Sequence, residues 1–381
     1  MRYANPYIRK IARGIKFLCA AYFVVFSFLY LYIFQRDLLA QVQFQMSAGD
    51  DDVHFLPFWS ALLCTSLLWV LGLFISRILH WLPLRLRAAT WFLPFLLLTA
   101  LTHWRFPQFG DSGSLPSVFW IIVILALYFI LLLIGRMNLD STKERGYFST
   151  YAWPNALLLA LMTAACVSFS NTDIVLHRTL RAAKQIEVGD YDAVLEMARY
   201  EQHPSRQLSA MTAMALSNRG ELGDCLFAYP QPHGVEGLLP QLADTALFCN
   251  LPLLAGRHLG YMRGARSTVP LFLEAISSRP KAQPSVHDYR VAAALLERNL
   301  PEFVNLVQSD TLALTHQHYR EALVLQAHLA NDSTLAPADS LLRADFVEFQ
   351  SLLNVDGTKD EREFRCRNRF GATYWTYFYF H

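Results

Sequence analysis

Long apolar runs separated by short polar connections occupy the first 172 residues of the chain. A bilayer core about 30 Å thick needs about 20 consecutive apolar residues in a helix. Backbone groups find no water in lipid, so runs of this kind are expected to be helical. The pattern predicts about five transmembrane helices, at residues 15–34, 55–76, 88–104, 115–135 and 151–171. The third is the shortest and contains Pro94, which leaves a re-entrant or interfacial segment as an alternative.

Lys and Arg are distributed unevenly between the two sides that these crossings define. One side carries 11 basic residues and the other carries two. The larger group comprises Arg2, Arg9, Lys10, Arg13, Lys16, Arg77, Arg85, Arg87, Arg136, Lys143 and Arg145, and the smaller comprises Arg36 and Arg105. The positive-inside rule places the N-terminus in the cytoplasm, and five crossings then place everything after residue 172 on the far side. The first apolar run exceeds the apolar core of a signal peptide and is expected to remain as an anchor.

Amphipathic helical periodicity replaces the long apolar runs after residue 172. A helix at 174–188 turns at Gly189 into a second helix, and the next pair turns at Gly220, 31 residues later. This interval is close to the tetratricopeptide (TPR) period of about 34 residues. Later pairs are expected at 239–261 with 268–278, 286–298 with 301–307, and 316–330 with 338–353. The predicted fold class is therefore all-α: a polytopic transmembrane bundle in residues 1–172, followed in residues 173–381 by a TPR-like α-solenoid whose concave face binds proteins.

The two parts also differ in charge. Residues 1–172 contain 13 Lys and Arg against 7 Asp and Glu, whereas residues 173–381 contain 20 against 24. A slightly acidic second part of mixed charge offers no phosphate-binding surface, so nucleic acid is not an expected partner. The middles of the five apolar segments contain no ionisable residue, which disfavours an ion or proton pathway in this chain alone.

The C-terminal segment is unusually aromatic, with seven aromatic side chains in the eight residues that begin at Tyr374. Two interpretations are open. The segment packs on the preceding helices or on the membrane interface, where Trp and Tyr are favoured. Alternatively, it is a docking tail, and its partner-binding candidates are Tyr374, Trp375, Tyr377 and Tyr379.

Three short segments carry a resemblance to a known family: residues 215–222 (ALSNRGEL), residues 227–231 (FAYPQ) and the terminal Thr373-Tyr374-Trp375. With these motifs the chain resembles uncharacterised inner-membrane proteins of Bacteroidetes that join a helical membrane bundle to a TPR-like C-terminal domain. The resemblance implies a bacterial inner membrane and a periplasmic second domain. It implies no activity, because the family has none assigned.

An acidic cluster in the first external loop is the main candidate for chemistry. Asp50, Asp51 and Asp52, with His54 nearby, resemble in one respect the external loops of glycosyltransferases that use lipid-linked sugars. Carboxylates in such a loop can hold Mg²⁺ or Mn²⁺ or act as a base. Those enzymes have many more crossings than five, and a solvated acidic loop is the simpler interpretation.

Other patterns in the sequence give only weak indications of a catalytic or metal site. Residues 110–113 (GDSG) match a serine-protease motif but lie in a short loop between membrane helices. His316 and His318 are two residues apart and point to different faces of one helix, so a shared metal is not expected. Cys225 and Cys249 form the candidate disulfide of an oxidising compartment. No metal or nucleotide motif occurs, and no cofactor is expected.

Three hypotheses about function follow. The first is a non-enzymatic envelope adaptor that is anchored in membrane lipid and binds another envelope protein through its periplasmic domain. The second is a small or degenerate lipid-linked glycosyltransferase-like enzyme that uses the acidic loop. The third is an accessory subunit of a transport or secretion complex.

Overall fold

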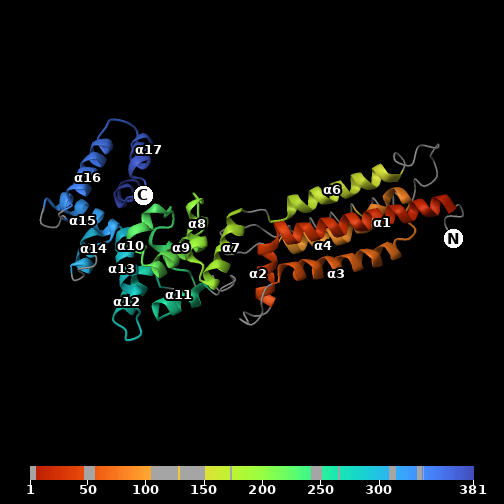
Figure 1. Cartoon of the computed structure of the whole chain (residues 1–381), viewed down its shortest axis with the longest axis horizontal. Helices are drawn as coiled ribbons and strands as arrows, with labels where there is room; N and C mark the ends of the chain where they lie inside the picture. Colours follow the sequence, from red (N-terminus) through yellow and green to blue (C-terminus); the bar gives the residue numbers. More distant parts are fainter. Residues whose placement is uncertain are drawn as a thin grey trace. The chain divides into compact units, whose positions relative to one another are not determined.

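The computed structural model describes residues 6–46, 56–103, 128, 151–171, 174–241, 251–264, 267–308, 315–332, 337 and 339–381. All regular structure in these residues is helical (Figure 1). The chain divides into two compact units, Met1–His177 and Arg178–His381. The prediction of an all-α fold is confirmed for the described part of the chain.

The first unit contains the apolar helices. They are α1 (Pro6–Leu29), the π-helical turn η1 (Tyr30–Phe34), α2 (Arg36–Met46), α3 (Pro57–Ile78), the 3₁₀ segment η2 (Leu84–Trp91), α4 (Phe92–Thr102) and α6 (Trp153–Phe169). Three described segments are long and apolar enough to cross a membrane: Lys10–Phe34, Pro57–Ile78 and Leu84–Thr102. A fourth is counted only if α6 and the helix after it, which are bent relative to each other, form one broken span. The chain is therefore described as a membrane protein.

The first three predicted crossings coincide with these three segments. The fourth, at 115–135, lies outside the described residues apart from Tyr128, whose ring stacks on Phe92 with centroids 4.2 Å apart. The fifth corresponds to α6, which has 17 residues. The predicted total of five crossings is thus not confirmed by the described residues.

Polar contacts at the two ends of the bundle define the helix directions. Near the start of α6, the Asn155 side chain accepts a hydrogen bond from the Ala88 amide at 2.6 Å and donates one to the Leu84 carbonyl at 2.8 Å. At the other end of α6, the Asn171 amide donates to the Thr102 carbonyl at 2.9 Å. Since both ends of α6 meet the corresponding ends of the η2–α4 segment, the two run in the same direction.

The core of the first unit is aromatic. Phe23 is fully buried and its ring contacts Trp91 and Phe95, with centroids 4.8 and 5.0 Å away. Trp91 in turn packs directly over Gly72 of α3, where an added Cβ would overlap its ring. The absence of a side chain at Gly72 therefore allows α3 to approach η2 closely.

The second unit consists of short helices. They are α7 (Ile174–Val188), which contains the boundary between the units, α8 (Tyr191–Arg199), α9 (Arg206–Arg219), α10 (Leu222–Cys225), the 3₁₀ turns η5 (Leu226–Ala228) and η6 (Gly234–Gly237), α11 (Leu251–Leu259), α12 (Val269–Ser277), α13 (Ser285–Leu296), α14 (Leu300–Val307), α15 (Gln317–Ala330), α16 (Ser340–Leu353), α17 (Lys359–Phe370) and α18 (Tyr374–Phe380). The predicted pairs 286–298 with 301–307 and 316–330 with 338–353 correspond to α13 with α14 and α15 with α16.

A repeated helix ending gives the second unit its periodicity. Helices α7, α9, α11, α13 and α15 are each followed by a residue in the left-handed conformation, with φ between 54° and 86°. These residues are Gly189, Gly220, Gly260, Arg298 and Asn331. A left-handed residue ends a helix by letting following amides bond to its last carbonyls. The intervals of 31, 40, 38 and 33 residues extend the spacing expected from the first two glycines.

The repeats do not form an extended stack in which each pair contacts only its neighbours. Helix α10 packs against α15, about 90 residues later in the chain. At this contact His316 Nδ1 lies 2.9 Å from Asp224 Oδ2. In an open solenoid each repeat contacts only adjacent repeats. The expected TPR-like solenoid is therefore not confirmed, because α10 contacts a helix that is not its neighbour in the chain.

Candidate partner-binding pocket

Two short helices at the end of the chain build the most distinctive part of the second unit. Helix α17 starts at a capping box, in which Thr358 Oγ1 accepts from the Glu361 amide and Glu361 Oε2 accepts from the Thr358 amide. Gly371 separates α17 from α18, and a Cβ at this position would lie 2.5 Å from the Arg367 carbonyl oxygen. The Thr373 side chain then caps α18 by accepting from the Thr376 amide. The aromatic segment is therefore a well-delimited helix.

A buried carboxylate attaches α18 to α15. Glu321 and His318 are each about 1% exposed, and His318 Nδ1 lies 3.0 Å from Glu321 Oε2. His318 Nε2 accepts a hydrogen bond from the Phe227 amide, so the ring proton is on Nδ1 and is donated to Glu321. The same carboxylate accepts from the Tyr374 amide at 2.7 Å. Glu321 thus joins the start of α18 to α15 and, through His318, to the loop that begins at Phe227.

The aromatic side chains of α18 fill the core beside this carboxylate. Trp375 is 1% exposed, donates its indole N–H to the Glu321 carbonyl at 2.8 Å, and contacts the Phe346 ring. Tyr374 is also buried, and it contacts Phe227. Truncation of a buried Trp or Phe costs about 3–5 kcal/mol. The burial of Trp375 and Tyr374 therefore makes α18 a part of the core of the second unit.

Four tyrosine and tryptophan side chains were predicted as partner-binding candidates, and the structure places them differently. Tyr374 and Trp375 lie in the core, where burial raises the pKa of Tyr374. Tyr379 is half-buried against Phe349, with ring centroids 5.8 Å apart. Tyr377 is 8% exposed and lines a pocket. Tyr374 and Trp375 thus pack in the core, and of the four candidates Tyr377 is the one that lines the pocket.

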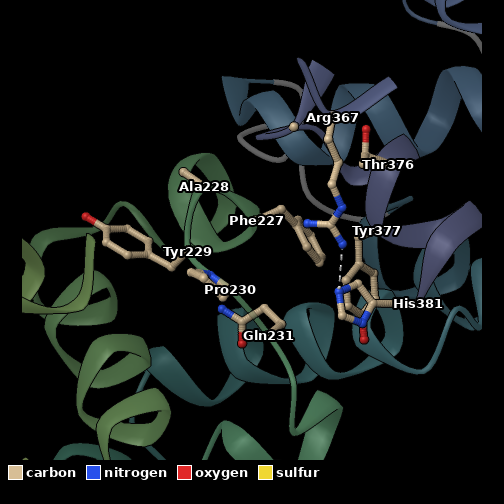
Figure 2. A pocket seen from close by; sticks show the side chains of 10 residues that line it. Phe227, Ala228, Tyr229, Pro230, Gln231, Arg367, Thr376, Tyr377 and His381 are labelled. Carbon is tan, nitrogen blue, oxygen red and sulfur yellow. Dashed lines mark hydrogen bonds between the residues drawn. The ribbon is translucent and has the colours of Figure 1, made fainter. Parts of the chain in front are cut away.

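The pocket lies between the α10–η6 loop and the two C-terminal helices. Its volume is about 120 Å³. Its lining residues come from two parts of the chain about 140 residues apart: Phe227, Ala228, Tyr229, Pro230 and Gln231 on one side, and Arg367, Gly371, Thr376, Tyr377 and His381 on the other. Figure 2 shows the Arg367 guanidinium group and the His381 ring facing each other beside Tyr377, with Phe227 adjacent.

The charge in the pocket comes from Arg367. Its Nε donates to Glu363 Oε1 at 2.6 Å, and its Nη2 lies 3.5 Å from His381 Nε2. Burial lowers the pKa of His381, and the nearby Arg367 lowers it further. A neutral imidazole accepts at Nε2 from the guanidinium group, so the proton of this ring is on Nδ1. The pocket therefore presents a charged donor group beside a neutral ring.

The lining supports binding more readily than catalysis. The Tyr377 hydroxyl donates to the Leu296 carbonyl at 3.0 Å, and the Thr376 hydroxyl donates to the Phe370 carbonyl at 2.6 Å. Both hydroxyl groups are thus held in structural hydrogen bonds. Pockets for drug-sized ligands are typically about 300–1,000 Å³, several times larger than this one. Its size is suited to one amino-acid side chain.

The other residues singled out in the sequence are distributed as follows. Asp50, Asp51, Asp52, His54 and residues 110–113 lie outside the described residues. His316 bonds to Asp224, whereas His318 bonds to Glu321. Cys225 forms no disulfide with another described cysteine, and Cys249 lies outside the described residues, so their pairing stays a prediction. Among the described residues, no group of three His, Cys, Asp or Glu side chains is arranged to hold a metal ion.

Sequence reasoning did not single out Arg367 or His381. Residues 227–231 and the start of α18 carried the family resemblance, and the structure brings these segments together at the pocket and the adjoining Glu321 carboxylate. A capping-box pattern at Thr358 and Glu361 was visible in the sequence and would have identified α17, which presents Arg367.

Comparison with known proteins gives one match. The model of a family described as "Family of unknown function (DUF6057)" matches residues 21–282 and 266–381. No curated protein and no solved structure matches the chain.

Proposed function

The chain belongs to the DUF6057 family of unknown function, and from this premise we propose that it is a membrane-anchored adaptor whose second unit binds a partner protein. The first unit supplies the anchor, with three described segments long and apolar enough to cross a membrane. The second unit supplies the binding site, at the pocket beside α18.

The proposed orientation places the second unit on the side of the membrane opposite the N-terminus. The excess of basic residues on the N-terminal side supports this orientation. So does the common direction of the η2–α4 segment and α6, which is the direction that five crossings predict for the third and the fifth. The family resemblance supports the bacterial inner membrane as the membrane and the periplasm as the compartment of the second unit.

The pocket is the observation that carries the adaptor proposal. It is formed where distant segments of the chain meet, it has room for one side chain, and its wall combines apolar surface with one guanidinium group. A protein partner can insert a single side chain into such a site while the surrounding surface supplies further contact. A few anchoring side chains commonly carry most of the energy of a protein interface.

The enzyme alternative concerns a different part of the chain. Asp50, Asp51, Asp52 and His54 lie outside the described residues, so a glycosyltransferase-like site there stays a prediction. The third hypothesis, an accessory subunit of a transport or secretion complex, is a special case of an adaptor. The identity of the partner would distinguish it.

Photo-crosslinking in native membranes tests the adaptor proposal. A benzophenone amino acid replaces Ala228, an exposed residue at the pocket, and a control replaces Leu341, which is 77% exposed on α16 and does not line the pocket. We expect one discrete crosslinked polypeptide from position 228 and none of that mass from position 341. Crosslinking only to lipid, or the same weak products from both positions, would contradict a partner at the pocket.

A further inference from the structure

Positive charge exceeds negative charge around the pocket. Among the described side chains that shift the pKa of His381, Arg367, Arg298 and Lys359 are cationic and Glu363 is anionic. Glu363 is already bonded to Nε of Arg367. An anionic group that enters the pocket therefore meets a net attractive field.

The donor groups of Arg367 are only partly used. Within the described part of the chain, Nε bonds to Glu363 and Nη2 approaches His381, but no acceptor is bonded to Nη1. A guanidinium group presents its donors in a planar fork that matches a carboxylate. Because the side chain of Arg367 is 47% exposed, an incoming acceptor can reach it from solvent.

The other residues that line the pocket indicate which kind of molecule would bear the anionic group. Phe227 lies next to the guanidinium group, and Pro230 adds apolar lining to the same pocket, whereas the Tyr229 ring points away from Arg367. A free inorganic anion makes no favourable apolar contact with this surface. A polypeptide, by contrast, can place an apolar residue on it and an acidic side chain beside Arg367. The available volume of about 120 Å³ is compatible with one such side chain.

We infer that the pocket recognises the carboxylate side chain of an acidic residue in a partner polypeptide, with Arg367 as its charged contact. This inference rests on the proposed adaptor function and specifies the chemistry of the same site. Since the guanidinium group is half exposed and screened by solvent, a single pair of this kind changes affinity by about fivefold or less. The experiment therefore has to detect weak binding.

Saturation-transfer NMR on the full chain in detergent micelles provides such a measurement. The probes are the dipeptides acetyl-Leu-Glu-amide and acetyl-Leu-Gln-amide, which differ only in the charge of the side chain. We expect saturation transfer to the Glu peptide to exceed transfer to the Gln peptide by about two- to fivefold. In Arg367→Ala the difference should disappear, and in Arg367→Lys, which keeps the charge, part of it should remain.

Arg369 provides the matched control, because it lies on the same helix, pairs with Glu348 and does not line the pocket. Arg369→Ala should retain the preference for the Glu peptide. Equal transfer to both peptides in the unmodified protein, or an unchanged preference in Arg367→Ala, would overturn the inference. Displacement of the Glu peptide by inorganic phosphate at similar concentration would show that the site takes any small anion, which would also overturn it.

The two proposals can fail separately. A crosslinked partner at position 228 together with no preference for the Glu peptide would leave the adaptor function standing and reject the carboxylate. A clear preference for the Glu peptide without any crosslinked polypeptide in membranes would reject the adaptor.

Discussion

Gly223 lies where α10 packs against the start of α15. A Cβ at this position would stand 2.8 Å from Cγ of His316 and 2.9 Å from Cζ of Tyr319, both closer than packed carbon atoms allow. Gly223→Ala should therefore push α10 and α15 apart and destabilise the second unit by about 1–3 kcal/mol. Thermal unfolding of the detergent-solubilised protein should show a midpoint several degrees lower.

Gly264→Ala is the matched control for this substitution. At Gly264 the nearest atom to an added Cβ is Ser267 Oγ at 4.0 Å, and the backbone is not left-handed. Its unfolding midpoint should stay within a degree or so of the unmodified protein. If both variants unfold at the same temperature, the close approach of α10 to α15 does not exist in solution.

His258 should make stability depend on pH. Burial lowers the pKa of its imidazole below the ordinary value of 6.5, and its Nε2 lies 2.8 Å from Ser217 Oγ. Because the unfolded chain takes up a proton here more readily than the folded chain, the contribution of this residue is complete above pH 6.5 and is lost as the pH falls through the lowered pKa. Unfolding midpoints at pH 7.5 and pH 5.5 measure the effect.

The variant His258→Gln retains a polar side chain but cannot titrate. It should show a smaller drop in midpoint between the two pH values than the unmodified protein. The remaining drop includes His381, whose pKa is lowered by burial and by Arg367. An identical drop in both proteins would exclude His258 as a source of the pH dependence.

Helix α18 depends on Glu321 for its attachment. The carboxylate accepts hydrogen bonds from His318 Nδ1, the Tyr374 amide and the Gln317 side chain, and it is 1% exposed. Without the carboxylate these donors stay buried with no acceptor, and each unsatisfied buried donor costs about 1–3 kcal/mol. Glu321→Ala should release α18, so limited proteolysis should cleave near Gly371 much faster than in the unmodified protein.

An exposed ion pair on the neighbouring helices provides the control. Glu348 on α16 pairs with Arg369 on α17, and their side chains are 37% and 60% exposed. Such pairs contribute about 1 kcal/mol or less. Glu348→Ala should therefore leave the rate of cleavage near Gly371 almost unchanged. Equal cleavage of both variants would mean that the buried carboxylate does not hold α18.

Element boundaries were predictable wherever a local signal marked them. Pro301 predicted the start of α14, and Gly189 and Gly220 predicted the ends of α7 and α9. Arg298 ends α13 in the left-handed conformation that favours Gly or Asn, so its identity alone gave no sign of this ending. Helix α17 was not predicted, because its sequence, KDEREFRCRNRF, is strongly polar and the capping-box pattern at Thr358 and Glu361 was not used. Local signals thus marked the predicted boundaries and also the start of the helix that was missed.

Sequence patterns did not predict the contacts between segments that are distant in the chain. Periodicity predicted helix pairs, but the contact of α10 with α15 depends on the shape of Gly223 and its neighbours 90 residues away. The aromatic side chains of α18 were expected either in a core or at a partner surface, and only the structure separates Trp375 from Tyr377. Arg367 became a candidate for the same reason, because Phe227 and His381 meet it only in the folded chain.

The orientation of the whole molecule follows from the number of crossings. An odd number places the second unit opposite the N-terminus, and an even number places both on one side. Fusion of alkaline phosphatase, which is active only outside the cytoplasm, after His381 of the full chain should give an active enzyme. A fluorescent protein that matures only in the cytoplasm should be dark at the same position. Fusions of both reporters after residue 80, between the second and third predicted crossings, should give the reverse pattern.

Each outcome of the reporter experiment has a direct structural consequence. Activity of the phosphatase after His381 would agree with five crossings, in which the segment predicted at 115–135 returns the chain so that α6 runs in the same direction as the η2–α4 segment, and would exclude four. It would also expose the pocket and Arg367 to the periplasm, where the partner would have to reside. Fluorescence at that position would mean an even number of crossings and would move the partner to the cytoplasm. The chemistry inferred for Arg367 is the same on either side, so this experiment determines which compartment should be searched for an acidic partner.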